Sequence, residues 1–338
     1  LAERPAARAV VINSGQPNAC TGDEGMWNCR TTQELVAGAL GLEASDVLPA
    51  STGVIGAQLK MDLWEKAAPA LAANLGKATP EDFAKAIMTT DAFHKISHRE
   101  VSLPGGVVRL VGMAKGAGMI CPNMATMLSV VLCDAQVEAP VWQKMLRDAV
   151  DLTFNRVTVD GDTSTNDTLY GLANGASGVP ASGEEAIKTL SAALTSVLGD
   201  LAYMLVKDGE GASKVARIHV TGAASDADAE RVARTVGHSQ LVKTALYGRD
   251  ANWGRIVAAV GRSGADFNPD DVVVTLCGVE LFRKGQPTDL DFDALLEEPL
   301  KQRDLPIDIV LGSGSGSYTL LASDLGHEYV NVNADYRS

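Results

Sequence analysis

The chain has no long uninterrupted apolar run, although 46% of its 338 residues are hydrophobic and 21% are charged. No run approaches the roughly 18 to 20 apolar residues that a membrane-spanning helix needs. The opening residues, LAERPAARAVVI, also do not place a charged segment, an apolar segment and a cleavage site in the order of a signal peptide. The sequence therefore predicts a soluble globular protein of the cytoplasm without a membrane partner, and its length suggests two domains or lobes.

Positive charge is scarce, because 29 Lys and Arg residues stand against 42 Asp and Glu residues, which gives a net charge of -13. Such a chain offers no broad positive field to attract the phosphates of nucleic acid or anionic lipid, so nucleic acid is excluded as a partner. A small cationic substrate suits this field, although an acidic composition alone usually reflects solubility.

Cysteine and histidine are also scarce, with five of each. The cysteines are odd in number, scattered and without a CxxC pair, so neither a disulfide framework nor a zinc site is indicated. His94 and His98 lie four residues apart, but no further ligand pattern joins them. The acid-rich segment 159–167, VDGDTSTND, lacks the glycine position and the distant glutamate of a calcium-binding EF-hand. The sequence predicts no metal, and segment 159–167 is interpreted as a loop that supports a site.

Short β-branched runs alternate with longer patterns of helical spacing, which predicts a mixed α/β protein. The expected helices cover residues 61–75, 80–90, 140–154, 183–206 and 225–236. The expected strands cover residues 7–13, 107–113, 126–135, 216–222, 271–281, 307–312 and 329–336. Pro80 and the two acids that follow it form a favourable helix start.

Glycine-rich polar loops separate these elements, and loops of this kind are where a site is commonly built. One of them, GSGSGS at residues 312–317, resembles a phosphate-binding loop. No Lys-Ser or Lys-Thr pair follows it, so nucleotide binding is not favoured.

The most informative segment runs from Lys115 to Asp134, KGAGMICPNMATMLSVVLCD. A glycine-rich turn leads to the small residue Ala125, and Thr126 then begins a run that is typical of a buried strand. A threonine in this position can attack the preceding carbonyl group and break the chain. The freed α-amine, with an ordinary pKa of about 8, can then serve as the base. The alternative is an ordinary threonine at the start of a strand, and the local sequence alone does not exclude it.

Eight motifs, one of them within this segment, occur in order along nearly the whole chain: NSGQPNACTG (13–22), STGVIG (51–56), TTDAF (89–93), KGAGMICPNMATML (115–128), TVDGDTSTNDT (158–168), KDGEGASK (207–214), GRDANWGRI (248–256) and YVNVNADYRS (329–338). Together they resemble the signatures of the ornithine acetyltransferase family, also called bifunctional glutamate N-acetyltransferase. Two departures are visible. Cys121 stands where the family often has another residue, and the family usually has several dozen residues before the position of Leu1. We therefore expect the natural start to precede Leu1.

The resemblance implies a self-processing α/β fold with layered sheets and helices, of the N-terminal-nucleophile-like type found in that family. Cleavage between Ala125 and Thr126 would leave an α chain of residues 1–125 and an associated β chain of residues 126–338. Thr126 would then be the nucleophile that carries the acyl group.

The resemblance also implies a set of residues around this nucleophile: Thr52 and Gly53 for the oxyanion hole, and Thr89, Lys115, Glu210, Asn333 and Ser338 for substrate contacts. A lysine is a suitable partner for the α-carboxylate of an amino acid. The glutamate would hold an ammonium group or pass protons to and from the leaving amine, as a site residue with a catalytic role.

The implied reaction is a ping-pong acetyl transfer in arginine biosynthesis, from N-acetylornithine to glutamate through an acetyl group on Thr126. It requires no cofactor, while the use of acetyl-CoA as a second acetyl donor stays open. The expected assembly is a dimer of processed α/β pairs. Two alternatives remain: a self-processing aminopeptidase or amidohydrolase, in which water takes the acyl group, and a non-catalytic amino-acid-binding protein.

Overall fold

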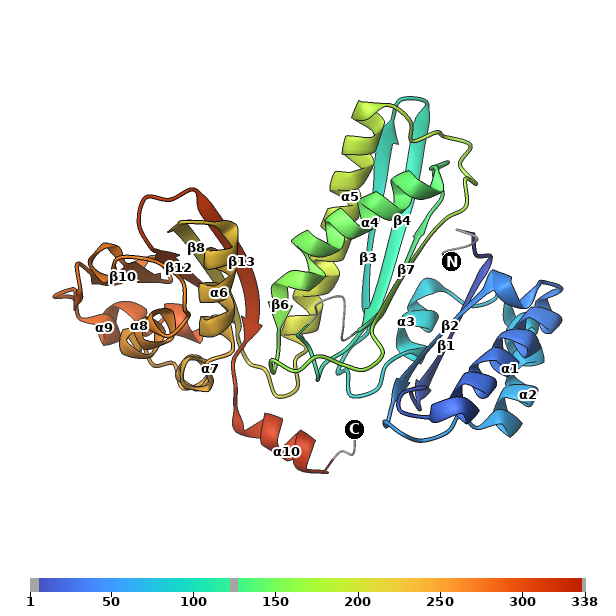
Figure 1. Cartoon of the computed structure of the whole chain (residues 1–338), viewed down its shortest axis with the longest axis horizontal. Helices are drawn as coiled ribbons and strands as arrows, with labels where there is room; N and C mark the ends of the chain where they lie inside the picture. Colours follow the sequence, from blue (N-terminus) through green and yellow to red (C-terminus); the bar gives the residue numbers. More distant parts are fainter. Residues whose placement is uncertain (1–5, 122–126, 336–338) are drawn as a thin grey trace.

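The computed structural model describes residues 6–121 and 127–335, which form three β-sheets and the helices that cover them (Figure 1). A two-stranded sheet lies at one end of the molecule, a four-stranded sheet stands in the middle, and a seven-stranded sheet lies at the other end. Sheets and helices are layered in each of the three units, which confirms the predicted mixed α/β architecture.

The first unit contains two parallel strands with the helices that connect and follow them: β1 (Ala9–Gly15), α1 (Gly22–Leu40), β2 (Val47–Gly53) and α2 (Met61–Asn74). Helix α1 is the crossover that a parallel pair requires, because a tight turn cannot join two strands that run in the same direction. Buried Val36, Val47 and Trp64 form the small core, and α2 packs beside α1. The two strands end together, since Gly15 is paired with Gly53.

The second unit contains the four-stranded sheet and the helices around it: α3 (Pro80–Ala86), β3 (Lys95–Leu103), β4 (Gly106–Lys115), β5 (Leu128–Cys133), α4 (Ala139–Leu152), β7 (Thr168–Ala173) and α5 (Glu184–Lys207). The strand order is β3-β4-β5-β7, and α4 and α5 lie on one side of the sheet (Figure 1). Helix α3 begins with a capping box between Thr79 and Asp82, so the predicted helix start at Pro80 is confirmed.

Helix α5 differs from the expectation that no segment of the chain has the length and composition of a membrane-spanning helix. By both criteria this helix is long and apolar enough to cross a bilayer. In the fold its leucines at 190, 194, 198 and 201 are fully buried, and the helix packs against α4 and against strands β3 and β4. Burial in the core of this unit accounts for its apolar composition.

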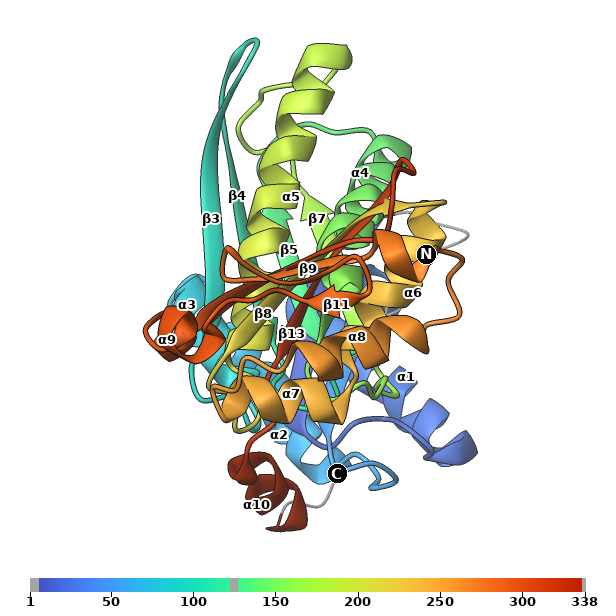
Figure 2. The same cartoon turned by 90° about the vertical axis from the view of Figure 1, so that its left-hand side faces the viewer.

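The third unit contains the seven-stranded sheet with its helices: β6 (Val157–Thr158), β8 (Val215–Ala223), α6 (Asp226–Gly237), α7 (Gln240–Tyr247), α8 (Trp253–Gly261), β9 (Val273–Leu276), β10 (Val279–Arg283), β11 (Gln286–Pro287), α9 (Phe292–Leu296), β12 (Asp304–Val310) and β13 (Gly316–Ser323). The strand order is β11-β10-β9-β12-β8-β13-β6. Helices α6, α7 and α8 lie together on one side of this sheet (Figure 2).

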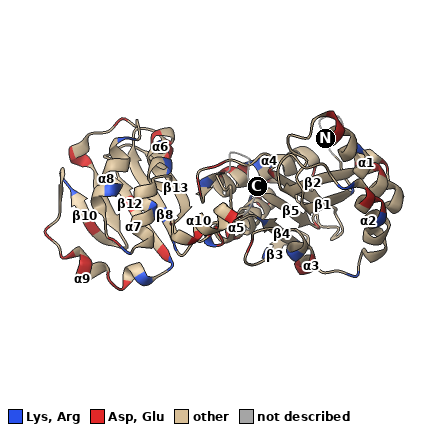
Figure 3. Cartoon of the chain, turned by 90° about the horizontal axis from the view of Figure 1, so that it is seen from below, with Lys and Arg blue, Asp and Glu red and all other residues tan. Residues whose placement is uncertain are grey.

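Acidic and basic residues are interspersed along the elements of the described part, without a separate basic band (Figure 3).

The predicted single strand at residues 271–281 is wrong, because the chain turns back within it. Cys277 and Gly278 have φ values of 50° and 81°, and they separate β9 from β10, which pair antiparallel. Two consecutive residues with positive φ are what a two-residue hairpin turn requires. The apolar run therefore supplies two strands of the sheet.

The predicted strand at residues 329–336 is also wrong, because helix α10 (His327–Asp335) occupies these residues up to the end of the described part. The alternating pattern YVNVN favours a strand, but a strand needs a neighbour for its backbone hydrogen bonds. A helix satisfies those bonds internally, and it places Tyr329 and Asn333 four residues apart on one face. Helix α10 has no buried residue and lies at the base of the molecule (Figure 1).

Candidate active site

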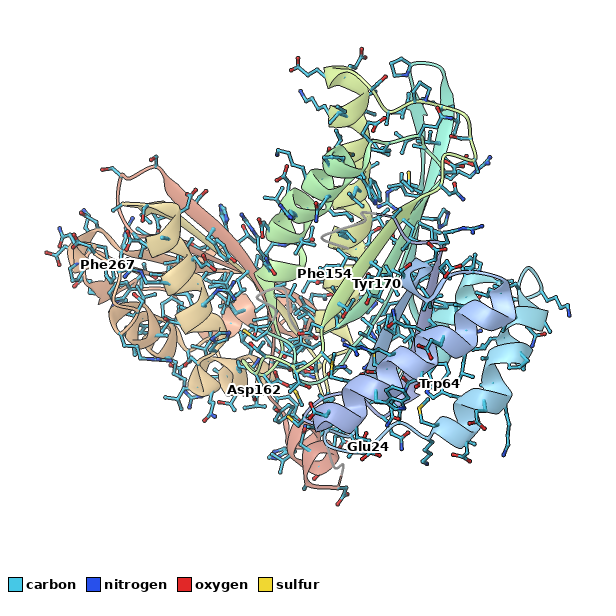
Figure 4. All side chains as sticks on the ribbon, turned by 45° about the vertical axis from the view of Figure 1, so that its right-hand side comes forward. Glu24, Trp64, Phe154, Asp162, Tyr170 and Phe267 are labelled. Carbon is cyan, nitrogen blue, oxygen red and sulfur yellow. The ribbon has the colours of Figure 1, made fainter. Side chains whose placement is uncertain are left out.

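A cavity of about 370 Å³ lies where residues from all three units come together. Its walls include the ends of β2 and β4, the start of β5, loop 159–167 and one face of α10. Asp162, which lines it, lies near the base of the molecule, between the seven-stranded unit and the first turn of α1, where Glu24 is labelled (Figure 4). Its volume suits a small ligand.

The cavity brings together six residues that the sequence singled out in five separate motifs: Thr52, Gly53, Thr89, Lys115, Glu210 and Asn333. The expected residues Ala125, Thr126 and Ser338 lie outside the described residues. Met127 and Leu128, which follow Thr126 directly in the chain, line the same cavity. The fold therefore juxtaposes the expected site residues that it describes, and their roles stay predictions.

Thr52 and Gly53 stand at the end of β2, beside the end of β1. Gly53 has a φ of 135°, and a Cβ atom added to it would lie 2.1 Å from the carbonyl carbon of Gly15. Glycine is required here both by the backbone conformation and by the close approach of β1. Both residues line the cavity, and a hydroxyl and a backbone N–H are donors of the kind that stabilise a developing oxyanion.

Lys115, the last residue of β4, is the only cationic side chain among the described residues that line the cavity. Its Nζ donates a hydrogen bond to Thr89 Oγ1 at 2.8 Å and lies 3.4 Å from Thr52 Oγ1. Burial lowers the pKa of Lys115, while Asp91, with Oδ2 3.8 Å from Nζ, opposes that change. A buried cation among hydroxyl groups is a suitable partner for a carboxylate.

Behind Lys115 lies a buried charge cluster that the sequence analysis did not identify, made of Asp91, Lys95 and Asp208. Lys95 Nζ lies 2.6 Å from Asp91 Oδ1 and 2.5 Å from Asp208 Oδ2, and the Lys95 side chain is fully buried. Asp91 also accepts hydrogen bonds from the backbone N–H groups of Gly116 and Thr89, at 2.6 Å and 3.1 Å. Burial raises the pKa of Asp91, but the neighbouring cations outweigh it and hold that pKa below its ordinary value. The cluster therefore fixes the backbone on both sides of the cavity wall.

Asp160 organises the glycine-rich segment that precedes the proposed cleavage point. Its carboxylate accepts hydrogen bonds from the backbone N–H groups of Met119 at 2.6 Å, Ile120 at 3.0 Å and Asp162 at 3.2 Å. Burial raises its pKa, and these three donors oppose the rise. These contacts agree with the interpretation of 159–167 as a supporting loop.

Asp167, at the end of the same loop, is a second cavity residue that the sequence analysis did not single out. Its Oδ2 is buried and has no hydrogen-bond partner in the part of the chain that the structure describes. Burial raises the pKa of Asp167 to about 8, although the Met127 N–H and the charge of Lys115 both lower it. The acidic composition of the loop was the only sequence feature that indicated a site here. It could not show which of the carboxyl groups is buried.

Glu210 and Asn333 close the cavity from the side of α10. Asn333 Nδ2 donates to Glu210 Oε2 at 2.9 Å, and Tyr329 lines the cavity one helical turn earlier. The backbone of Tyr329 packs so closely on Gly211 that an added Cβ would lie 2.5 Å from the Tyr329 nitrogen. The glycine-flanked motif KDGEGASK thus lets α10 approach Glu210.

Metal and phosphate binding find no support among residues 6–121 and 127–335. No group of three or more potential metal ligands occurs there, and His94 lies 3.4 Å from Glu81 instead. In the loop GSGSGS, a Cβ added to Gly314 would lie 2.0 Å from the Ala223 carbonyl oxygen. The glycines of that loop serve close backbone packing in the third unit.

The family and sequence comparisons cover all or nearly all of the chain. The ArgJ family model matches residues 1–338. The arginine biosynthesis bifunctional protein ArgJ of Nitratidesulfovibrio vulgaris is 74% identical over 338 residues, which are 100% of this chain and 86% of that protein. The protein of the same description from Geobacter sulfurreducens is 47% identical over 333 residues, 98% of this chain and 85% of that protein. The crystal structure of arginine biosynthesis bifunctional protein argJ from Bacillus halodurans is 37% identical, with a TM-score of 0.60, and covers 62% of this chain and 100% of that chain.

Proposed function

The chain belongs to the ArgJ family, and we propose that it is the acetyltransferase that moves the acetyl group of N-acetylornithine to glutamate in arginine biosynthesis. The observation that carries this proposal is the meeting of Thr52, Gly53, Thr89, Lys115 and Glu210 in one cavity of suitable size. These five residues come from four separate motifs, and together they offer the donors, the cation and the carboxylate that such a transfer needs.

We propose that the chain first cleaves itself before Thr126. Attack of the Thr126 hydroxyl on the Ala125 carbonyl carbon would move the acyl chain from nitrogen to oxygen, and water would then hydrolyse the ester. The products are an α chain of residues 1–125 and a β chain of residues 126–338. Strands β4 and β5, one from each product, are paired over six residues, from Leu110 with Cys133 to Lys115 with Leu128. This pairing supports two chains that stay associated.

In the first half-reaction, the Thr126 hydroxyl would attack the acetyl carbonyl carbon of N-acetylornithine, and the free α-amine would take the hydroxyl proton. The Thr52 hydroxyl and the Gly53 N–H would stabilise the oxyanion. The C–N bond then breaks, and the nitrogen leaves with that proton as the α-amine of ornithine. In the second half-reaction, the amine of glutamate attacks the acetyl carbonyl carbon of acetyl-Thr126, and the ester C–O bond breaks. One proton of the amine passes to the threonine oxygen, which restores the hydroxyl group as N-acetylglutamate leaves.

Substrate recognition in this proposal uses the remaining cavity residues. Lys115 would bind the α-carboxylate, with Thr89 beside it, and Glu210 would hold an ammonium group or pass a proton to the leaving amine. Asn333, which donates to Glu210, and Ser338 would complete the contacts from the C-terminal side.

Three further elements belong to the same proposal. No cofactor is required, because the nucleophile, the base and the oxyanion donors all come from the chain. The relatives are described as bifunctional, which supports acetyl-CoA as a second acetyl donor. A dimer of processed pairs in the cytoplasm is the proposed assembly and location.

The decisive experiment is mass spectrometry of the protein mixed with N-acetylornithine and no acceptor. Ornithine should be released, and the β chain should become heavier by one acetyl group, located on its first residue. Added glutamate should then remove the label as N-acetylglutamate. A Thr126→Ala variant should remain uncut, unlabelled and folded.

Other results of this experiment identify the alternatives. Rapid release of acetate that glutamate does not suppress would indicate a hydrolase. Binding of N-acetylornithine without cleavage or labelling would indicate a non-catalytic amino-acid-binding protein. A label on a residue other than Thr126 would refute the nucleophile assignment.

A further inference from the structure

The two amino acids of the proposed reaction carry side chains of opposite charge. Both have an α-carboxylate, but N-acetylornithine ends in an ammonium group and glutamate ends in a second carboxylate. The described cavity wall has one cation, Lys115, and four carboxyl groups: Asp160, Asp162, Asp167 and Glu210. With Lys115 used for the α-carboxylate, this wall suits an ammonium group and repels a second carboxylate.

Three of the four carboxyl groups have hydrogen-bond donors or solvent beside them. Asp160 accepts three backbone N–H groups, Glu210 accepts the amide of Asn333, and Asp162 is exposed to solvent. Asp167 differs, because its Oδ2 is buried and has no hydrogen-bond partner among the described residues. A buried ionised oxygen without a partner is unfavourable, so this group gains most from taking up a proton or from meeting a cation.

We propose that Asp167 lets one cavity accept both amino acids, carrying a proton when the side-chain carboxylate of glutamate is bound and none when the side-chain ammonium of N-acetylornithine is bound. In its neutral form the carboxyl group donates a hydrogen bond to the glutamate carboxylate. In its ionised form it pairs with the ammonium group. The proton comes from bulk water and returns to it between the two half-reactions. This inference rests on the proposed function, and it makes Asp167 a residue that determines substrate specificity.

The surroundings of Asp167 are consistent with such a change of protonation near neutral pH. Burial raises its pKa to about 8, against the lowering effects of the Met127 N–H and of Lys115 on β4. The other titratable groups of the cavity are the three carboxyl groups named above and Tyr329 on α10. Behind the loop, Asp167 also lines a second cavity of about 290 Å³, where the titratable neighbour is Cys29 of α1. Lys115 is therefore the only cation that faces Asp167 from the described walls.

The test compares the wild type with Asp167→Asn over pH 6.5 to 9.5, by measuring kcat/KM for glutamate and for N-acetylornithine. Dividing the wild-type value by the variant value at each pH cancels the ionisation of the substrates themselves. For glutamate this quotient should fall as pH rises through about 8, and for N-acetylornithine it should rise. The ratio of protonated to ionised Asp167 falls about tenfold for each unit of pH. The glutamate quotient divided by the N-acetylornithine quotient should follow this ratio, and should therefore drop by roughly 100-fold between pH 7 and pH 9. Asp148→Asn on α4, an exposed carboxylate that does not line the cavity, should show no such change.

A second measurement keeps the inference testable if Asp167→Asn does not fold. Calorimetric titration of the wild type with glutamate, in two buffers of different ionisation enthalpy at pH 8.5, should show uptake of a fraction of a proton. Equal heats in both buffers, or a relative quotient that changes less than about threefold, would overturn the inference while leaving acetyl transfer intact. If neither substrate is turned over by the wild type, the proposed function itself fails, so the two failures are distinguishable.

Discussion

The two walls of the cavity, one from residues before position 125 and one from residues after it, carry opposite charges. The first wall contributes Lys115 and the hydroxyl groups of Thr52 and Thr89, and its described lining residues include no carboxyl group. The second wall contributes all four carboxyl groups of the described lining. If the chain is cut as proposed, each product therefore brings one sign of charge, and neither product alone forms the site.

The walls also differ in how their buried charges are paired. Asp91, behind the first wall, has two lysines and two backbone N–H groups within reach, and its pKa lies below the ordinary value. Asp167, in the second wall, has an unpartnered Oδ2 within the described part of the chain, and its pKa is raised to about 8. The comparison supports the proposal that a rigid first wall would bind the α-carboxylate common to both substrates, and that the charge of the second wall would change with the substrate.

The rigid wall should be broken most severely by removing its hidden cation. Lys95→Met leaves Asp91 and Asp208 buried together without their shared partner. Removing one member of a buried ion cluster typically costs about 3 to 5 kcal/mol of stability. Chemical denaturation followed by circular dichroism should show this loss in the free energy of unfolding. Lys144→Met, which breaks an exposed ion pair with Asp148, is the matched control and should leave it nearly unchanged.

Loss of the cation in the cavity itself should affect activity more than folding. Lys115→Met removes the proposed partner of the α-carboxylate, and hydrogen bonds to charged groups contribute about 1.5 to 3 kcal/mol. Steady-state kinetics should show kcat/KM reduced by roughly 10- to 150-fold for both substrates, while cleavage of the chain continues. A chain that stays intact in this variant would assign Lys115 a structural role instead.

Much of the fold is predictable from the sequence where a single segment contains the whole signal. Strands β4, β5, β8 and β12 are apolar runs, and they occur close to the predicted positions. Strand β3 was not predicted, because its buried face includes Lys95 and Ser97 and so hides the alternation of polar and apolar residues. Helix α10 was predicted as a strand, since local propensity cannot report whether a neighbouring strand exists.

The candidate site divides in the same way. The residues taken from motifs could be recognised from the sequence, because a motif is a local pattern. Those that the structure describes meet in the cavity. Asp91 and Lys95 could not be recognised as a pair with Asp208, which lies 113 residues beyond Lys95 in the chain. The importance of Asp167 depends on burial, which is a property of the packed chain and not of the acidic loop that contains it.

The contrast between Asp91 and Asp167 can be sharpened by the pH dependence of stability. The folded-state pKa of Asp167, about 8, lies above its unfolded value of about 3.9, so its favourable contribution is complete below pH 3.9 and is lost as pH rises toward 8. Asp167→Asn should therefore gain stability relative to the wild type as pH rises from 4 to 8. For Asp91 the sign is reversed, since its lowered pKa gives a contribution that is present above pH 3.9 and lost in acid. Denaturation series of Asp167→Asn and Asp91→Asn at several pH values will show whether the stabilities of the two variants, relative to the wild type, diverge in these directions.

The smallest expected effect concerns the exposed contact that ties α10 to the acidic wall. Asn333→Ala removes the 2.9 Å hydrogen bond to Glu210, and an exposed bond of this kind contributes about 1 kcal/mol or less. Because α10 has no buried residue, loss of this hydrogen bond should hardly change the free energy of unfolding. It should raise KM for N-acetylornithine by roughly two- to fivefold with little change in kcat, since the bond orients a substrate contact and takes no part in the chemistry. Asn331→Ala is the matched control, because the Asn331 amide bonds Glu328 within the same helix and not the cavity wall. Equal kinetics for the two variants would show that α10 covers the cavity without positioning Glu210. A large loss of kcat in Asn333→Ala alone would place Asn333 among the groups that act on the reacting atoms.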